Sequence, residues 1–277
     1  MQRNLDTRQI EDDIAAFKQD LVLRPDSAEG HYKLGVSYAQ LDRLPEAIDA
    51  YKRAIRCKPD YAYAYCNLGV IYGSQQRLNE AIRAFKQALN VAPDLAEAYY
   101  NLGVAYAKLE RHREAASAYQ EAIRFRPDVA EAYFNLGVER GQLGDWQDAI
   151  DAYKQAIRLR PDYAKAYYNL GIAYGRLERW QDEIAAYKQL VRLRPRHAWA
   201  HYRMGLALGN LERTDESTQA LQSSIRIKPD LEEAHLALGT TYFQSRNRSA
   251  AVAEYKVLKG LGSQLAPELY GIIYNKR

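Results

Sequence analysis

Seven prolines recur along the chain at a constant interval of 34 residues, and this period constrains the fold more than any other feature. A chain that repeats at such a spacing is built from stacked copies of one small structural unit. If each proline stands at position 32 of a 34-residue unit, a new unit begins three residues after each proline. This gives seven full units, flanked by segments 1–27 and 266–277. The prolines are Pro25, Pro59, Pro93, Pro127, Pro161, Pro195 and Pro229, and the units are 28–61, 62–95, 96–129, 130–163, 164–197, 198–231 and 232–265.

Within this frame, position 8 is glycine in every unit, position 7 is leucine in six of the seven, and positions 11 and 24 are mostly aromatic. Their spacing predicts an amphipathic helix in the first half of each unit and a second helix after a polar turn. We expect the glycine at position 8 to lie against the small residue at position 20, where the two helices cross. Each unit is therefore predicted to be an antiparallel helix pair.

This pattern resembles the tetratricopeptide repeat (TPR) family at its glycine, proline, alanine and tyrosine positions. The resemblance implies an all-α, right-handed superhelical solenoid of helix pairs whose first helices line a concave, peptide-binding groove. It also implies a protein-interaction scaffold and no enzyme. We expect no catalytic residues and no cofactor.

Position 6 of the first helix carries asparagine in four consecutive units, namely Asn67, Asn101, Asn135 and Asn169. An asparagine side chain has two N–H donors and a carbonyl acceptor, so a row of them can bind the backbone of an extended peptide. The row resembles the asparagine ladder in the repeat domain of O-linked N-acetylglucosamine transferases. Alternatively, these amides bond neighbouring helices within the scaffold.

Charged and aromatic residues complete the predicted peptide-binding site: Lys33, Tyr63, Lys108, Arg176, Trp199 and Arg203. The cations favour a partner with an acidic segment, although charges on a solvated helix face can equally serve solubility alone. Large exposed aromatics such as Tyr63 and Trp199 are good anchors for a ligand.

The ends of the chain depart from the repeat. Residues 10–27 align with a second helix that lacks its first, so segment 1–27 is predicted either to cap the array or to associate with another copy of the chain. The last residues, 266–277, are predicted to form a capping helix with Leu269 and Ile273 on its buried face.

Charged residues interrupt the apolar pattern in two repeats. Glu139 and Arg140 stand at positions 10 and 11 of the fourth unit, and Glu183 replaces alanine at position 20 of the fifth. Because a buried charge needs a partner, Arg140 and Glu183 could pair, or each could reach water.

Composition excludes several classes of function. The net charge is +4, with basic and acidic residues interspersed, so nucleic acid binding is not expected. No apolar run is long enough to insert into a membrane, and the five histidines form no metal motif. A cytoplasmic location is expected.

The sequence thus predicts a scaffold that binds a peptide of a partner protein. Two alternatives remain: a structural scaffold that self-assembles into a homo-oligomer through its terminal helices, and a recruiting module of an enzyme whose catalytic part lies elsewhere.

Overall fold

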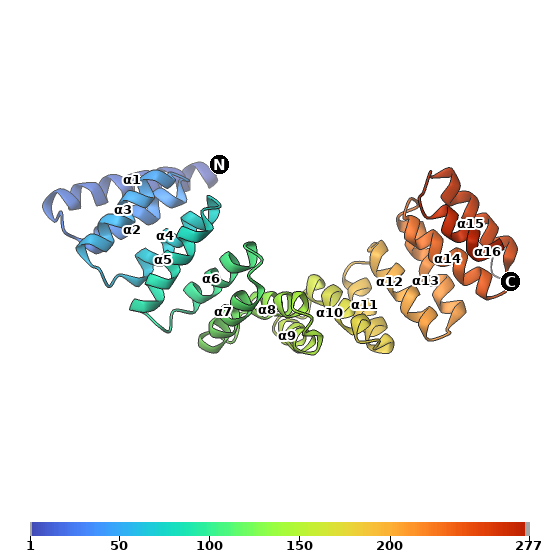
Figure 1. Ribbon diagram of the computed structural model, residues 1–277. Helices are drawn as coiled ribbons and strands as arrows, with labels where there is room; N and C mark the ends of the chain where they lie inside the picture. The colour runs from blue at the N-terminus through green and yellow to red at the C-terminus, as the bar shows by residue number, and fades with distance from the viewer. Residues whose placement is uncertain (1, 275–277) are drawn as a thin grey trace. The chain divides into compact units, whose positions relative to one another are not determined.

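The computed structural model describes residues 2–274, with side chains described from residue 7 onward. This part of the chain forms sixteen α-helices and no strand, which confirms the all-α prediction (Figure 1). The helices are α1 (Gln2–Leu23), α2 (Ala28–Gln40), α3 (Leu44–Cys57), α4 (Ala62–Ser74), α5 (Leu78–Val91), α6 (Ala96–Lys108), α7 (His112–Phe125), α8 (Ala130–Gln142), α9 (Trp146–Leu159), α10 (Ala164–Arg176), α11 (Trp180–Leu193), α12 (Ala198–Asn210), α13 (Thr214–Ile227), α14 (Glu232–Gln244), α15 (Arg248–Gly260) and α16 (Ala266–Tyr274).

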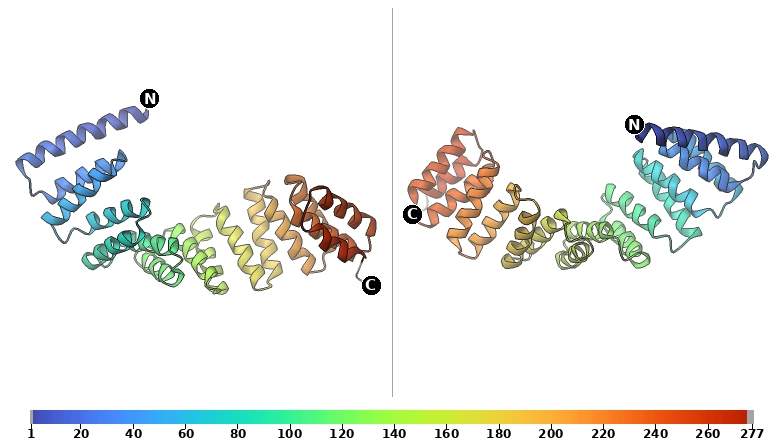
Figure 2. Two further views of the ribbon diagram at one scale, coloured as in Figure 1. Left: turned by 45° about the horizontal axis from the view of Figure 1, so that its top comes forward. Right: turned by 180° about the vertical axis from the view of Figure 1, so that it is seen from behind.

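The helices divide into two compact units, the first ending at Leu143 and the second beginning at Gly144. In the first unit, α2 packs on α3, α4 on α5 and α6 on α7, and each second helix also packs on the next first helix. The second unit repeats this order with the pairs α10–α11, α12–α13 and α14–α15 (Figure 2). We call the first helix of each repeat helix A and the second helix B.

In five repeats, the glycine at position 8 of helix A lies under the position 24 side chain of helix B; these glycines are Gly35, Gly69, Gly103, Gly171 and Gly205. A Cβ atom added at Gly35 would lie 2.6 Å from the Tyr51 ring, and one added at Gly171 would lie 2.6 Å from the Tyr187 ring. The prediction that the small residue at position 20 lies against this glycine is therefore wrong. Position 20 of helix B faces position 12 of helix A instead. In the second repeat, for example, a Cβ atom added to Gly73 at position 12 would lie 3.9 Å from the Cβ atom of Ala81 at position 20. Thus the close approach accommodates an aromatic ring rather than a second small residue.

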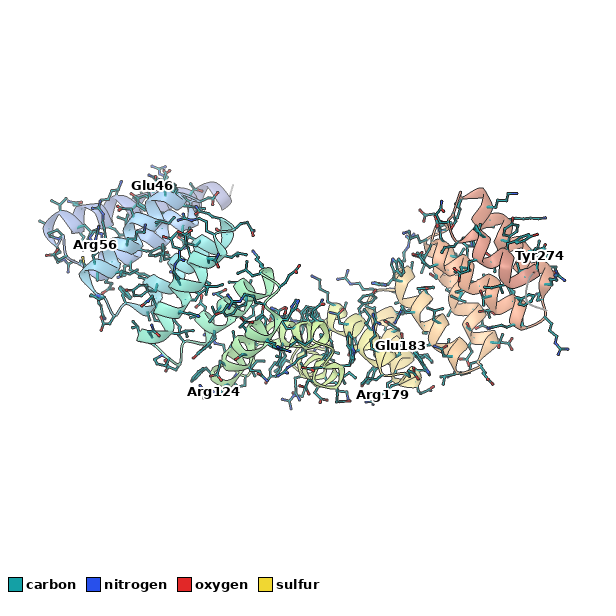
Figure 3. The ribbon with its side chains drawn as sticks, in the orientation of Figure 1. Glu46, Arg56, Arg124, Arg179, Glu183 and Tyr274 are labelled. Carbon is teal, nitrogen blue, oxygen red and sulfur yellow. The ribbon has the colours of Figure 1, made fainter. Side chains whose placement is uncertain are left out.

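In four repeats, an arginine at position 16 holds the turn between helices A and B. Its guanidinium stacks on the position 11 tyrosine and pairs with the acidic residue at position 19. Arg43, for example, lies 4.6 Å from the centre of the Tyr38 ring and 2.7 Å from Glu46. The same ring contact and ion pair recur at Arg77, Arg111 and Arg179. Glu46 and Arg179 are labelled in Figure 3.

The two terminal helices differ in how they end the array. Helix α1 continues without a break from Gln2, so residues 2–9 extend it and do not fold back as a helix A. It places Asp13 and Asp20 where most other B helices carry alanine or serine. Helix α16 packs on α14 and α15 and buries Leu269 and Ile273. Leu269 takes the place over Gly239 that the position 24 side chain fills in earlier repeats.

Candidate peptide-binding surface

The A helices expose one row of side chains, at positions 2, 6, 9 and 13, which we call the A-helix face. On α4, Tyr63 is 53% exposed and Val70 is 43% exposed, with the half-buried Asn67 one turn from each. Helix α4 carries no charged residue. In the second unit, Trp199 of α12 is 38% exposed and lies edge-on to Tyr202 at 5.5 Å. Large apolar groups therefore remain available to a partner on this face.

The asparagines at position 6 serve the scaffold as well as the surface. Nδ2 of Asn67 donates to the hydroxyls of Tyr32 and Tyr51, at 3.2 and 3.3 Å, and Nδ2 of Asn135 donates to the Tyr100 hydroxyl at 3.2 Å. These tyrosines belong to the preceding repeat. Both amides thus join adjacent repeats, as the second interpretation of the row proposed, and Oδ1 takes no part in these bonds.

The phenols that accept these bonds remain protonated at neutral pH. Burial raises the pKa of Tyr51 to about 12, and the hydrogen bond from Asn67 offsets only part of that rise. Between the second and third predicted repeats, burial raises the pKa of the Cys66 thiol to about 12, and the nearby Asn101 amide opposes part of this rise. Asn169 is half-buried on α10. The row is therefore chemically uneven from repeat to repeat.

Arg203 replaces asparagine at position 6 of the sixth predicted repeat and is largely engaged by its own scaffold. Its Nη2 lies 3.4 Å from Glu183 Oε1, and the Glu183 side chain is 2% exposed. The sequence analysis suggested Arg140 as a partner of Glu183, whereas the structure provides Arg203 from the following repeat of the same unit. Burial raises the pKa of Glu183 to about 7, and the nearby guanidinium opposes part of this rise.

The remaining predicted cations occupy different environments. Lys33 pairs with Glu29 at 2.6 Å along helix α2, while Lys108 is exposed. Arg176 is also exposed, and its guanidinium lies 5.6 Å from the centre of the Trp146 ring. The structure does not gather these cations into one cluster within either unit. Glu139, the other buried acid, pairs with His112 at 2.7 Å.

A cavity that the sequence analysis missed opens between α6, α7 and α8. Its volume is about 260 Å³, and its lining is mostly apolar: Ala96, Glu97, Tyr100, Ala122, Arg126, Val129, Glu131 and Ala132. Two carboxylates at position 2 of consecutive A helices therefore share one apolar hollow. In the sequence, this cavity corresponds to glutamate at position 2 combined with alanine at position 27. These two positions are distant from each other within the repeat.

Within the part of the chain that the structure describes, no group of three histidine, cysteine or acidic side chains could hold a metal ion. No helix in that part is long and apolar enough to cross a membrane.

Comparisons with known proteins agree with this architecture. A family described as the C-terminal domain of cilia- and flagella-associated protein 70 matches residues 60–266, and a general TPR family matches residues 37–76. No curated protein sequence matches the chain.

Several solved structures have a similar fold. YrrB, described as a TPR protein with an unusual peptide-binding site, is 23% identical over 68% of this chain and 96% of its own, with a TM-score of 0.64. MamA is 27% identical over 61% of this chain and 92% of its own, with a TM-score of 0.59. The C-terminal part of a TPR protein from Cytophaga hutchinsonii is 17% identical over 86% of this chain and 98% of its own, with a TM-score of 0.72.

Proposed function

Because the chain belongs to the tetratricopeptide-repeat family described by the C-terminal domain of cilia- and flagella-associated protein 70, we propose that it binds a peptide segment of a partner protein on its A-helix face. The observation that carries this proposal is the exposed apolar row on α4, where Tyr63 and Val70 flank Asn67. Aromatic side chains of this kind contribute strongly to binding when a partner covers them.

The asparagine row supports the same function in a modified form. Since the N–H groups of Asn67 and Asn135 bond tyrosines of the preceding repeat, their Oδ1 atoms are the groups left to a ligand. An acceptor at this point suits a backbone N–H of an extended peptide. Each such bond contributes roughly 0.5–1.5 kcal/mol net, so affinity has to come mainly from the apolar anchors. YrrB, with its peptide-binding site, is a structural precedent.

The proposal can be tested by selecting peptides from a random phage-displayed library on the intact chain and measuring each selected peptide by fluorescence anisotropy. Tyr63→Ala/Val70→Ala should weaken binding at least tenfold, equivalent to about 1.4 kcal/mol. The matched control is Val22→Ala/Leu23→Ala, which also removes two exposed apolar side chains, each 80% exposed, but from α1. Failure to select any peptide, or equal weakening by both variants, would contradict the proposal.

The same control addresses a second candidate function, self-assembly through the N-terminal helix. Val22 and Leu23 are the most exposed large apolar residues described, and a hollow of about 600 Å³ lies between α1, α2 and α3 beside Val22. If a second copy covers this surface, light scattering should show an oligomer that Val22→Ala/Leu23→Ala dissociates. A chain that is monomeric at high concentration would exclude this candidate.

A further inference from the structure

The cavity between α6, α7 and α8 has the form of a pocket for one long side chain. Alanines at positions 96, 122 and 132, together with Val129 and the ring of Tyr100, supply an apolar lining. A lysine or arginine buries the methylene groups of its side chain readily while its charged end stays near water. A small apolar hollow beside carboxylates suits that combination.

Charge decides which side chain the cavity fits. Glu97 and Glu131 contribute two carboxylates to the lining, against one guanidinium from Arg126. Burial is the main cause of the raised pKa of Tyr100, and the negative charge of Glu131 adds to it; the charge of Glu97 acts in the same direction on Cys66. Among the residues that line the cavity, acidic side chains therefore outnumber basic ones.

We propose that this cavity binds a lysine or arginine side chain of the partner peptide, with the aliphatic portion against Ala122 and Val129 and the cationic end against Glu97 and Glu131. This inference rests on the proposed peptide-binding function and specifies which residue the peptide presents to the first unit. An acidic segment, as the sequence analysis favoured, would be repelled here. Arg126 is an internal competitor for the same carboxylates.

The corresponding positions of the second unit show how the cavity could be lost. Between the fifth and sixth predicted repeats, position 2 carries Lys165 and Trp199, and position 27 of the fifth repeat carries the buried Leu190 in place of alanine. The positive charge of Lys165 and the larger volume of Leu190 both disfavour the binding of a basic side chain there. Ala122→Leu therefore introduces a residue that another repeat already accommodates at this position.

The test uses the phage-displayed library on the intact chain, followed by synthetic peptides in which one selected lysine is replaced by norleucine, which keeps the aliphatic length but lacks the ammonium group. Selected peptides should share a lysine or arginine at one position, and norleucine should weaken binding about tenfold. Glu97→Gln/Glu131→Gln should abolish the difference between the two peptides, whereas the control Glu110→Gln, an exposed acid in the turn after α6, should preserve it. Arg126→Ala should strengthen binding of the lysine peptide.

Ala122→Leu should weaken binding of both peptides, with circular dichroism unchanged. Equal affinity of the wild type for the lysine and norleucine peptides, or an unchanged difference in Glu97→Gln/Glu131→Gln, would overturn the inference while leaving the proposed function intact. Selection of no peptide at all would overturn both.

Discussion

Two interfaces between consecutive repeats use equivalent positions with different chemistry. The first, which we call the neutral joint, lies between the third and fourth predicted repeats, in the first unit. The second, which we call the charged joint, lies between the fifth and sixth predicted repeats, in the second unit. The first joint has Ala107, Ala115 and Asn135 at positions 12, 20 and 6. The second has Gly175, Glu183 and Arg203 at those positions. The helices around both joints begin and end at equivalent positions. One backbone frame thus accommodates either a neutral joint or a charged one.

The charged joint requires its three residues together. A Cβ on Gly175 would lie 2.6 Å from Glu183 Oε2, so the carboxylate fits only because position 12 is glycine. Arg203 reaches the carboxylate from the next helix A, where asparagine would reach tyrosines instead. A substitution that changes one residue alone should therefore be unfavourable in either unit. Coupling of this kind is expected among groups in direct contact.

The largest expected effect on stability comes from placing a glutamate at position 20 of the neutral joint. Ala115 is fully buried, and Ala115→Glu leaves a carboxylate without its cation, which should lower the free energy of unfolding by about 3–5 kcal/mol. The triple variant Ala107→Gly/Ala115→Glu/Asn135→Arg should recover a substantial part of this loss. Urea titrations followed by circular dichroism measure both. Equal stability of the single and triple variants would show that the three residues do not act together.

The charged joint should also make stability depend on pH. The pKa of Glu183 is about 7 in the folded chain and 4.5 when unperturbed, so between these values the folded state holds a proton that the unfolded state has lost. This contribution is complete below pH 4.5 and declines as pH rises, by on the order of 2–3 kcal/mol once pH exceeds 7. Glu183→Gln should remove this dependence. Urea titrations from pH 5 to 8 that give parallel profiles for wild type and variant would refute it.

Replacing a position 12 glycine by alanine should have a smaller effect on stability, and Gly175 and Gly73 should respond in opposite directions. Gly175→Ala forces a methyl group against the Glu183 carboxylate and should cost about 1–3 kcal/mol. Gly73→Ala meets only the Ala81 methyl group, at 3.9 Å, and should stabilise the chain by up to about 1 kcal/mol through helix propensity. In a Glu183→Ala background the cost of Gly175→Ala should vanish. Thermal melts of the wild type and the four variants provide the measurement, and a cost that persists would mean that the carboxylate is not its cause.

The smallest expected effect concerns the turns that precede the B helices. Gly144 and Glu178 occupy equivalent turn positions with φ of 84° and 55°, a region that glycine adopts without the steric cost of a side chain. Gly144→Ala should destabilise the chain, and Glu178→Gly should stabilise it, each by about 1 kcal/mol. If both substitutions lower the melting temperature in thermal denaturation, the turn conformation is not what limits stability there.

Much of the architecture could be predicted because it repeats. The glycine, tyrosine and proline positions recur at constant spacing, so each repeat tests the assignment made in the others, and the helix pairs follow from local amphipathic pattern. The partner of each small residue could not be predicted in this way. Position 8 faces the aromatic ring at position 24, because the crossing point of two helices depends on their packing and not on either sequence alone.

The candidate site was predicted only in outline. Tyr63 and Trp199 are exposed as expected, whereas Arg203 is committed largely to Glu183 and the amides of Asn67 and Asn135 bond tyrosines of the previous repeat. Each of these contacts joins residues about one repeat apart. Sequence can place a polar residue on a helix face, but it does not show whether a neighbouring repeat has already used its hydrogen-bonding groups.

The amino-acid pattern alone is enough to predict a stack of tetratricopeptide helix pairs, because periodic burial of one helix face is encoded locally and repeated many times. The packing of the helices, in contrast, reveals that Ala122 leaves a cavity beside Glu97 and Glu131, and that Gly175 makes room for the buried carboxylate of Glu183. Cavities and ion pairs depend on the side-chain volumes and distances between helices, and these are set when the helices pack together.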